Sequence, residues 1–167
     1  MGNVKPIPDG NHSVTAGLVV KGGKQAIEYY KAAFGAQELG VSLWPDGEKV
    51  MHAELKIGDT KFYLGDEFPE MGAVSPKTLG GSPCSLNIYT EDCDALFNRA
   101  VGAGARVAPG PMGQLSDQFW GDRSGTFTDP YGYQWTIATR KEDLSKEEME
   151  RRSQEFFKQF AQQPTHA

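Results

Sequence analysis

Hydrophobic residues follow two spacings along the chain. In residues 14–20 every second position is apolar, which is typical of a β-strand with one buried face. In residues 24–34 the apolar positions are three and four apart, which is typical of a helix that packs along one side. Gly35 follows at once, and glycine is the usual residue beyond a helix C-terminus. The chain therefore begins with a strand and a helix.

Three further strands are predicted in the first half, over residues 37–44, 49–57 and 60–65. They are separated by the turn sequences Pro45-Asp46-Gly47 and Gly58-Asp59. The predicted order of the first half is therefore strand, helix and three strands.

The second half repeats this order. A strand is predicted over residues 84–90 and a helix over 92–101, followed by strands over 105–108, near 119–128 and over 133–139. The pair Gly35-Ala36 at the end of the first helix recurs as Gly104-Ala105. Two copies of one unit are expected to bury each other's apolar faces. We predict one domain over residues 14–140, with modules at about 14–66 and about 82–140, preceded by a lead over 1–13.

A separate helix is predicted in the C-terminal segment, residues 141–167. Ser145 and Glu148 form a capping box, and Phe156, Phe157 and Phe160 give the helix one apolar stripe. An isolated helix of this kind gains little stability by itself, so the stripe is expected to dock on the domain or on a partner subunit.

Composition limits the classes of partner. A formal charge of −5 and a pI near 5.2 argue against a nucleic-acid or anionic-membrane surface. No apolar run reaches membrane-spanning length and the N-terminal lead lacks a signal-peptide core, so a cytoplasmic location is expected. Two cysteines, Cys84 and Cys93, form no disulfide framework or zinc motif, and both are expected to be ordinary buried thiols.

The alternation within the strands separates two sheet faces. Apolar positions such as Leu18, Met51 and Ile137 are expected under the helices, and the opposite positions are expected to line a cleft. The predicted cleft side carries Thr15, Gly17, Val19, His52, Glu54, Lys56, Ser85, Asn87, Tyr89, Gln134 and Thr136.

Two groups of residues are candidates for chemistry. His52 and Glu54 share a face, where they form a proton-abstracting base, a noncanonical metal site or simply a solvated polar pair. Trp120 beside Arg123 offers an aromatic plate and a guanidinium that suit a planar or anionic ligand. The alternative is a structural use, with Asp122 pairing Arg123 or capping a turn.

Several motifs together resemble the glyoxalase/bleomycin resistance/dioxygenase superfamily, also called the vicinal oxygen chelate superfamily. The sequence LVV at 18–20 followed by AIEYYKAAFGA at 26–36 resembles its first strand and helix, and DPYGYQW at 129–135 resembles its last-turn signature. Its PhnB-like or glyoxalase-like subgroup is suggested by KPIP at 5–8, VMHAE at 50–54 and WGDRSG at 120–125.

The resemblance implies an α+β fold in which two βαβββ modules form a curved, barrel-like sheet around a cleft for a metal or a small molecule. Counting along the matching motifs places Thr15, about Tyr63, Ser85 and Thr136 where the metalloenzymes of the superfamily have His or Glu. Hydroxyl groups do not replace imidazole or carboxylate as ligands of zinc, nickel or iron. We therefore predict no metal site and no cofactor.

The predicted function is metal-independent binding of a small molecule, as in the drug-sequestering members that the sequence resembles. The ligand would contact Trp120, Arg123, Tyr63, Asn87, Tyr89 and Thr136. The alternative is a lyase, an isomerase or a metal-dependent enzyme acting on a small oxygenated substrate, with His52 and Glu54 as catalytic residues. A homodimer is expected, because open modules leave strand edges to be covered.

Overall fold

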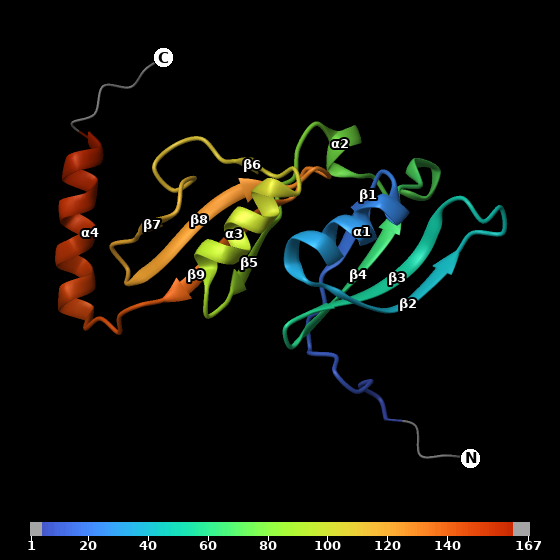
Figure 1. Ribbon diagram of the computed structural model, residues 1–167, viewed down its shortest axis with the longest axis horizontal. Coiled ribbons are helices and arrows are strands. Elements are labelled where there is room, and N and C mark those ends of the chain that lie inside the picture. The colour runs from blue at the N-terminus through green and yellow to red at the C-terminus, as the bar shows by residue number, and fades with distance from the viewer. Residues whose placement is uncertain (1–4, 162–167) are drawn as a thin grey trace.

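Two open β-sheets, each covered by a helix on one side, form the protein in the computed structural model, which describes residues 5–161 (Figure 1). The first sheet has the order β1-β4-β3-β2 and the second β5-β9-β8-β6, with β7 paired to β8. The first module consists of β1 (Gly17–Val20), α1 (Gly23–Phe34), β2 (Gln37–Leu43), β3 (Val50–Ile57) and β4 (Thr60–Asp66). The second consists of β5 (Ser85–Tyr89), α3 (Cys93–Gly102), β6 (Arg106–Val107), β7 (Ser116–Asp117), β8 (Asp122–Thr128) and β9 (Gln134–Arg140).

The predicted α+β class and the repeated βαβββ order are confirmed, with the two-residue strand β7 as an addition in the second module. The two sheets stay separate instead of closing into one barrel. Most predicted element ends differ from the observed ends by one or two residues, but the first strand is shorter than predicted. It begins at Gly17, where its parallel pairing with β4 starts, and Val14 ahead of it is 85% exposed.

The predicted assignment of sheet faces holds at most positions. Leu18, Trp135 and Ile137 are buried on the helix side, as expected. The prediction is wrong at Met51, which is exposed, whereas the preceding residue, Val50, is buried. The pairing of β2 with β3 shifts between Ser42 and Leu43, and this β-bulge changes the alternation at the start of β3.

The modules meet through α1 and α3 and share one hydrophobic core. The ring of Phe34, at the end of α1, lies 4.7 Å from Trp135 of β9 and 6.1 Å from Phe127 of β8. Arg99 of α3 reaches back and donates from Nε to the carbonyl of Ala33, at 2.8 Å. These contacts fix the orientation of one module against the other.

The connection between the modules, residues 67–84, is held by hydrogen bonds. It contains a 3-10 turn, η1 (Pro69–Met71), and one helical turn, α2 (Pro76–Leu79). Glu67 Oε2 accepts from the hydroxyls of Ser75 and Thr78, at 2.6 and 2.7 Å. These hydrogen bonds lower the pKa of the Glu67 carboxyl.

The predicted C-terminal helix is present as α4 (Lys146–Ala161), at the outer end of the second module (Figure 1). Ser145 accepts from the backbone of Glu148, as the capping box requires. Phe156 contacts Phe119 of the loop before β8, with ring centroids 5.1 Å apart, whereas Phe157 is 57% exposed. The side chain of Phe160 and residues 1–4 and 162–167 lie outside the described part.

Within residues 5–161 no helix has the length and apolar character needed to cross a membrane. The expectation of two buried thiols holds for Cys93 only. Cys84 is exposed because it precedes β5, the edge strand of its sheet.

Candidate functional site

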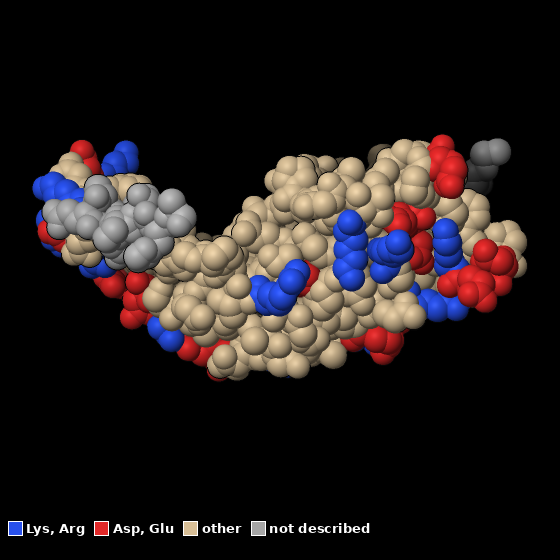
Figure 2. Space-filling view, turned by 90° about the horizontal axis from the view of Figure 1, so that it is seen from above, with Lys and Arg blue, Asp and Glu red and all other residues tan. Residues whose placement is uncertain are grey.

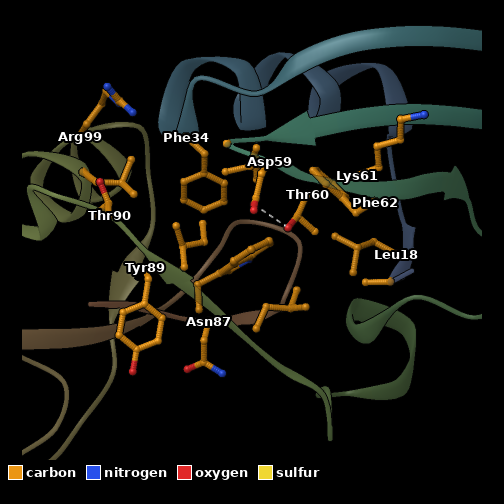
Figure 3. A pocket seen from close by; sticks show the side chains of 17 residues that line it. Leu18, Phe34, Asp59, Thr60, Lys61, Phe62, Asn87, Tyr89, Thr90 and Arg99 are labelled. Atoms are coloured by element: carbon orange, nitrogen blue, oxygen red, sulfur yellow. Dashed lines mark hydrogen bonds between the residues drawn. The ribbon is translucent and has the colours of Figure 1, made fainter. Parts of the chain in front are cut away.

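A cavity of about 520 Å³ lies between the two modules (Figure 3). The helix side of the first module contributes Leu18, Phe34 and Phe62, and α3 contributes Leu96. Trp135 lies next to Phe34 in the wall. The cavity is therefore built mainly from apolar side chains that continue the shared core.

Polar groups are confined to a few places in the wall. Asp59 and Thr60 form the turn between β3 and β4, where the Thr60 hydroxyl donates to Asp59 Oδ1 at 3.0 Å (Figure 3). Arg99 borders the cavity near the end of α1, where its Nε is occupied by Ala33. The wall therefore combines apolar surface with a few polar groups, which is the usual composition of a ligand pocket.

Strand β5 forms one wall of the cavity from its second residue, Leu86, onward. Residues 86–89 and Thr90 all line the cavity, so two predicted ligand residues, Asn87 and Tyr89, belong to it. Figure 3 shows that the polar ends of both side chains point away from the labelled aromatic ring of Phe34. These two residues therefore present mainly their backbone to the cavity.

A tyrosine hydroxyl separates the edge strands of the two sheets. Tyr133 donates to the carbonyl of Val19 at 3.0 Å and accepts from its N–H at 2.9 Å. The hydroxyl thus satisfies both outward backbone groups of Val19 in β1, as a neighbouring strand would. Burial raises the pKa of this phenol above its ordinary value.

The candidate base lies on the open face of the first sheet. His52 Nε2 is 3.9 Å from Glu54 Oε1, and the His52 ring lies 5.0 Å from that of Tyr63. The Tyr63 hydroxyl accepts from Asn11 at 2.6 Å. The structure thus brings together His52, Glu54 and Tyr63, at a surface where both members of the pair are well exposed.

Trp120 and Arg123 are not brought together. Arg123 lies on the helix side of β8, where it binds both carboxylate oxygens of Asp94 at 2.7 Å, and it also contacts Asp117 at 3.3 Å. Its hydrogen bonds lower the pKa of the Asp94 carboxyl. Arg123 is therefore engaged in joining β8 to α3 and β7.

Trp120 instead covers a buried carboxylate on the open face of the second sheet. Asp122 is 2% exposed, and its Oδ2 accepts from Trp120 Nε1 at 3.1 Å and from the Tyr89 hydroxyl at 2.7 Å. Arg140, its partner across β8 and β9, lies 3.7 Å from Oδ1. Hydrogen bonding to Asp122 raises the pKa of Tyr89.

The residues at the expected metal positions do not fit a metal ion. The Thr136 hydroxyl is paired with that of Thr126 at 2.9 Å, and Tyr63 is paired with Asn11. Thr15 precedes β1, and Ser85 begins β5. No group of three or more His, Cys, Asp or Glu able to hold a metal is present among residues 5–161.

Charge is distributed in small groups. On the face shown in Figure 2, Lys and Arg side chains alternate with Asp and Glu along the molecule. Elsewhere in the described residues, basic side chains are paired with nearby carboxylates, as in the pairs Arg123–Asp94 and Arg152–Glu142. The visible surface therefore lacks the continuous basic stripe that marks nucleic-acid binding.

Sequence reasoning missed the residues that enclose the cavity. Phe34 and Leu96 carried only the signal of a helix core face, and Arg99 carried none. Each of them reaches the cavity because the two modules dock there, and alternation within one strand contains no information on docking. The sequence suggested Asp122 as a partner of Arg123 or as a turn cap, whereas its partners are Trp120, Tyr89 and Arg140.

Comparisons with known proteins place the chain in a family. The sequence profile of the Glyoxalase/Bleomycin resistance protein/Dioxygenase superfamily matches residues 11–137. Protein Rv0887c of Mycobacterium tuberculosis is 38% identical over 136 residues, which cover 80% of this chain and 77% of that protein.

Solved structures show the same fold. The crystal structure of At5g48480 from Arabidopsis thaliana has a TM-score of 0.60 and 29% identity, covering 77% of this chain and 98% of that one. The PhnB protein from Bacillus cereus has a TM-score of 0.58 at 16% identity, with coverages of 77% and 99%. FosX from Listeria monocytogenes, crystallised with Mn(II) and sulfate, has a TM-score of 0.58 at 14% identity, with coverages of 83% and 96%. By its sequence profile and its fold, this chain belongs to the glyoxalase/bleomycin resistance protein/dioxygenase superfamily.

Proposed function

We propose that this protein binds a small, largely apolar molecule in the cavity between its two modules and needs no metal to do so. The observation that carries the proposal is the cavity itself. Its volume of about 520 Å³ lies within the range of ligand pockets, and apolar walls with a few polar groups are the usual composition of such pockets. Among the described residues that line the cavity, Asp59 is the one His, Cys, Asp or Glu, which supports binding without a metal.

The test uses anilinonaphthalene sulfonate, a planar aromatic probe whose fluorescence rises in apolar sites. Saturable binding is expected, and it should survive dialysis against a chelator. Ile88 lines the cavity from β5, so Ile88→Trp should fill part of the space and weaken binding by about tenfold or more. Asn98→Trp is the matched control, because Asn98 is exposed on α3 and does not line the cavity.

Equal binding by the wild type and Ile88→Trp would place the probe elsewhere and reject the cavity as the site. Loss of binding after chelation, restored by one transition metal, would reject metal independence. Thermal melting of each variant confirms that it is folded before the affinities are compared.

The second candidate function is proton abstraction from a small oxygenated substrate, favoured by the His52–Glu54 distance of 3.9 Å beside Tyr63. In this role His52 would take the proton and Glu54 would orient the ring. Deuterium incorporation from solvent into a hydroxyketone, followed by NMR, distinguishes the two functions. An enzyme loses the exchange in His52→Gln, whereas a binding protein shows no exchange above buffer in either form.

We also propose a cytoplasmic homodimer, with residues 14–140 as the functional domain. The support for a dimer is the edge strand β2, all seven residues of which are exposed. Symmetric pairing is the usual way in which such edges are covered.

A further inference from the structure

Strand β5 has an unpaired edge that faces the cavity. On its other edge it pairs in parallel with β9, and the N–H of Thr90 donates to the carbonyl of Ala138 at 2.9 Å. Successive peptide groups in a strand point to opposite edges. The N–H and C=O of Asn87 and Tyr89 therefore point away from β9, toward the first module. Within residues 5–161 no hydrogen bond reaches these four groups.

The opposing strand does not use this edge. In β1, the outward N–H and C=O of Val19 are both occupied by the Tyr133 hydroxyl. Tyr133 therefore acts as a spacer that keeps β1 and β5 from pairing with each other. The space that remains beside β5 is the cavity, which both strands line.

The two sides of the cavity next to the free edge of β5 differ in polarity and in burial. On the helix side the cavity is bounded by Phe34, Phe62 and Leu96, all nearly buried. On the other side lie the side chains of Asn87 and Tyr89, both of which are exposed. In an extended ligand chain paired with β5, side groups would alternate between the two faces. One set would contact the apolar wall, and the other set would face water.

We infer that the ligand of this cavity is a small molecule with amide groups in an extended chain, which adds to the free edge of β5 as a short extra strand. The inference rests on the proposed function and names its ligand class. The two outward residues, Asn87 and Tyr89, are about 7 Å apart along the strand, so two amide-bearing units span the binding edge. Main-chain hydrogen bonds hold the chain, and the apolar wall selects its alternate substituents.

The ligand side of the test uses a capped tetrapeptide in which valine alternates with threonine. Two further peptides carry N-methyl groups, one on both valine amides and the other on both threonine amides. Only one of these two sets can face β5 while the valines face the apolar wall. Calorimetry should show binding of the parent, little change for one methylated peptide and a loss of about tenfold or more for the other.

The protein side of the test removes one outward donor. Asn87→Pro eliminates an N–H that the β5–β9 ladder does not use, a position at which proline is tolerated in an edge strand. Asn87→Ala is the matched control, because it removes the side chain and keeps the N–H. Peptide binding should fall by about tenfold in Asn87→Pro only, and thermal melting of both variants shows whether each is folded before the affinities are compared.

The outcomes separate the two proposals. Binding of the aromatic probe without binding of any peptide overturns the ligand class and leaves the proposed function intact. Failure of both overturns the proposed function. Equal weakening by the two methylated peptides overturns strand addition, even where Asn87→Pro fails to fold. A dimer that peptide converts to monomer also overturns the inference, because a second copy of the chain would then be the natural occupant of the edge.

Discussion

At the scale of single residues, Asp129 explains why the motif at 129–135 is more than a turn. Its Oδ1 accepts from the backbone N–H groups of Tyr131 and Tyr133, and its Oδ2 accepts from Tyr30 and from Trp135 Nε1, all at 2.8–2.9 Å. Burial raises the pKa of this carboxyl, whereas the four hydrogen bonds act in the opposite direction. One side chain thus closes the turn and ties α1 of the first module to the second.

Replacing this carboxylate should destabilise the whole fold. Each Asp129 oxygen accepts two buried hydrogen bonds. In Asp129→Asn, the amide NH₂ replaces one of these oxygens and cannot accept them, so two buried donors lose their acceptor and face another donor. We expect the free energy of unfolding to fall by about 2–4 kcal/mol, measured by urea denaturation. Asp59→Asn, at an exposed turn, is the control and should change it by less than about 0.5 kcal/mol. An Asp129→Asn protein as stable as the wild type would contradict this role.

The local side of this picture was predictable. Alternation placed Leu18, Trp135 and Ile137 on the helix side, because each strand has one buried face. It failed at Met51, where the bulge depends on the partner strand. Alternation also did not assign Arg123 to either face of the sheet. The structure places this residue against Asp94, which is distant in sequence. Partners across elements are fixed by tertiary packing, which a period of two residues does not encode.

At the scale of elements, α4 differs from the other helices. It contacts the body through Phe119, whose ring also lies 4.9 Å from Trp120. Most of its other interactions are within the C-terminal segment, as in the pairs of Arg152 with Glu142 and Glu148. The capping box predicted where this helix begins, but the sequence left its docking partner open.

Removing α4 should therefore affect the neighbourhood of Trp120 more than the core. Truncation after Glu142 uncovers Phe119, and we expect a loss of about 1–2 kcal/mol with a red shift of tryptophan emission. Truncation after Ala161 is the control and should leave both quantities unchanged. If truncation after Glu142 changed neither the melting temperature nor the tryptophan emission, the contact of Phe156 with Phe119 would not stabilise the protein.

At the scale of the whole molecule, the repeated element order predicted two modules, and the structure shows them as two open sheets. The cavity was not predictable, because it arises where the modules dock. Its position depends on the bond from Tyr133 to Val19 and on that from Arg99 to Ala33. Neither bond has a local signal in the sequence.

The openness of the first sheet leads to the last prediction, which concerns assembly. Its edge strand β2 exposes Leu39, Val41 and Leu43 at 46, 37 and 42%, and Met51 beside it is 51% exposed. An apolar strand edge of this kind is normally covered, and a second copy of the chain is the simplest cover.

Light scattering after size exclusion should give twice the chain mass of 18.3 kDa at micromolar concentration. The double variant Val41→Lys with Leu43→Lys should be monomeric, because two charges at the edge oppose pairing. Leu79→Lys, at another exposed apolar position, should remain dimeric. A single 18.3 kDa species in the wild type would reject the dimer, and a dimer that persists in the double variant would move the interface away from β2.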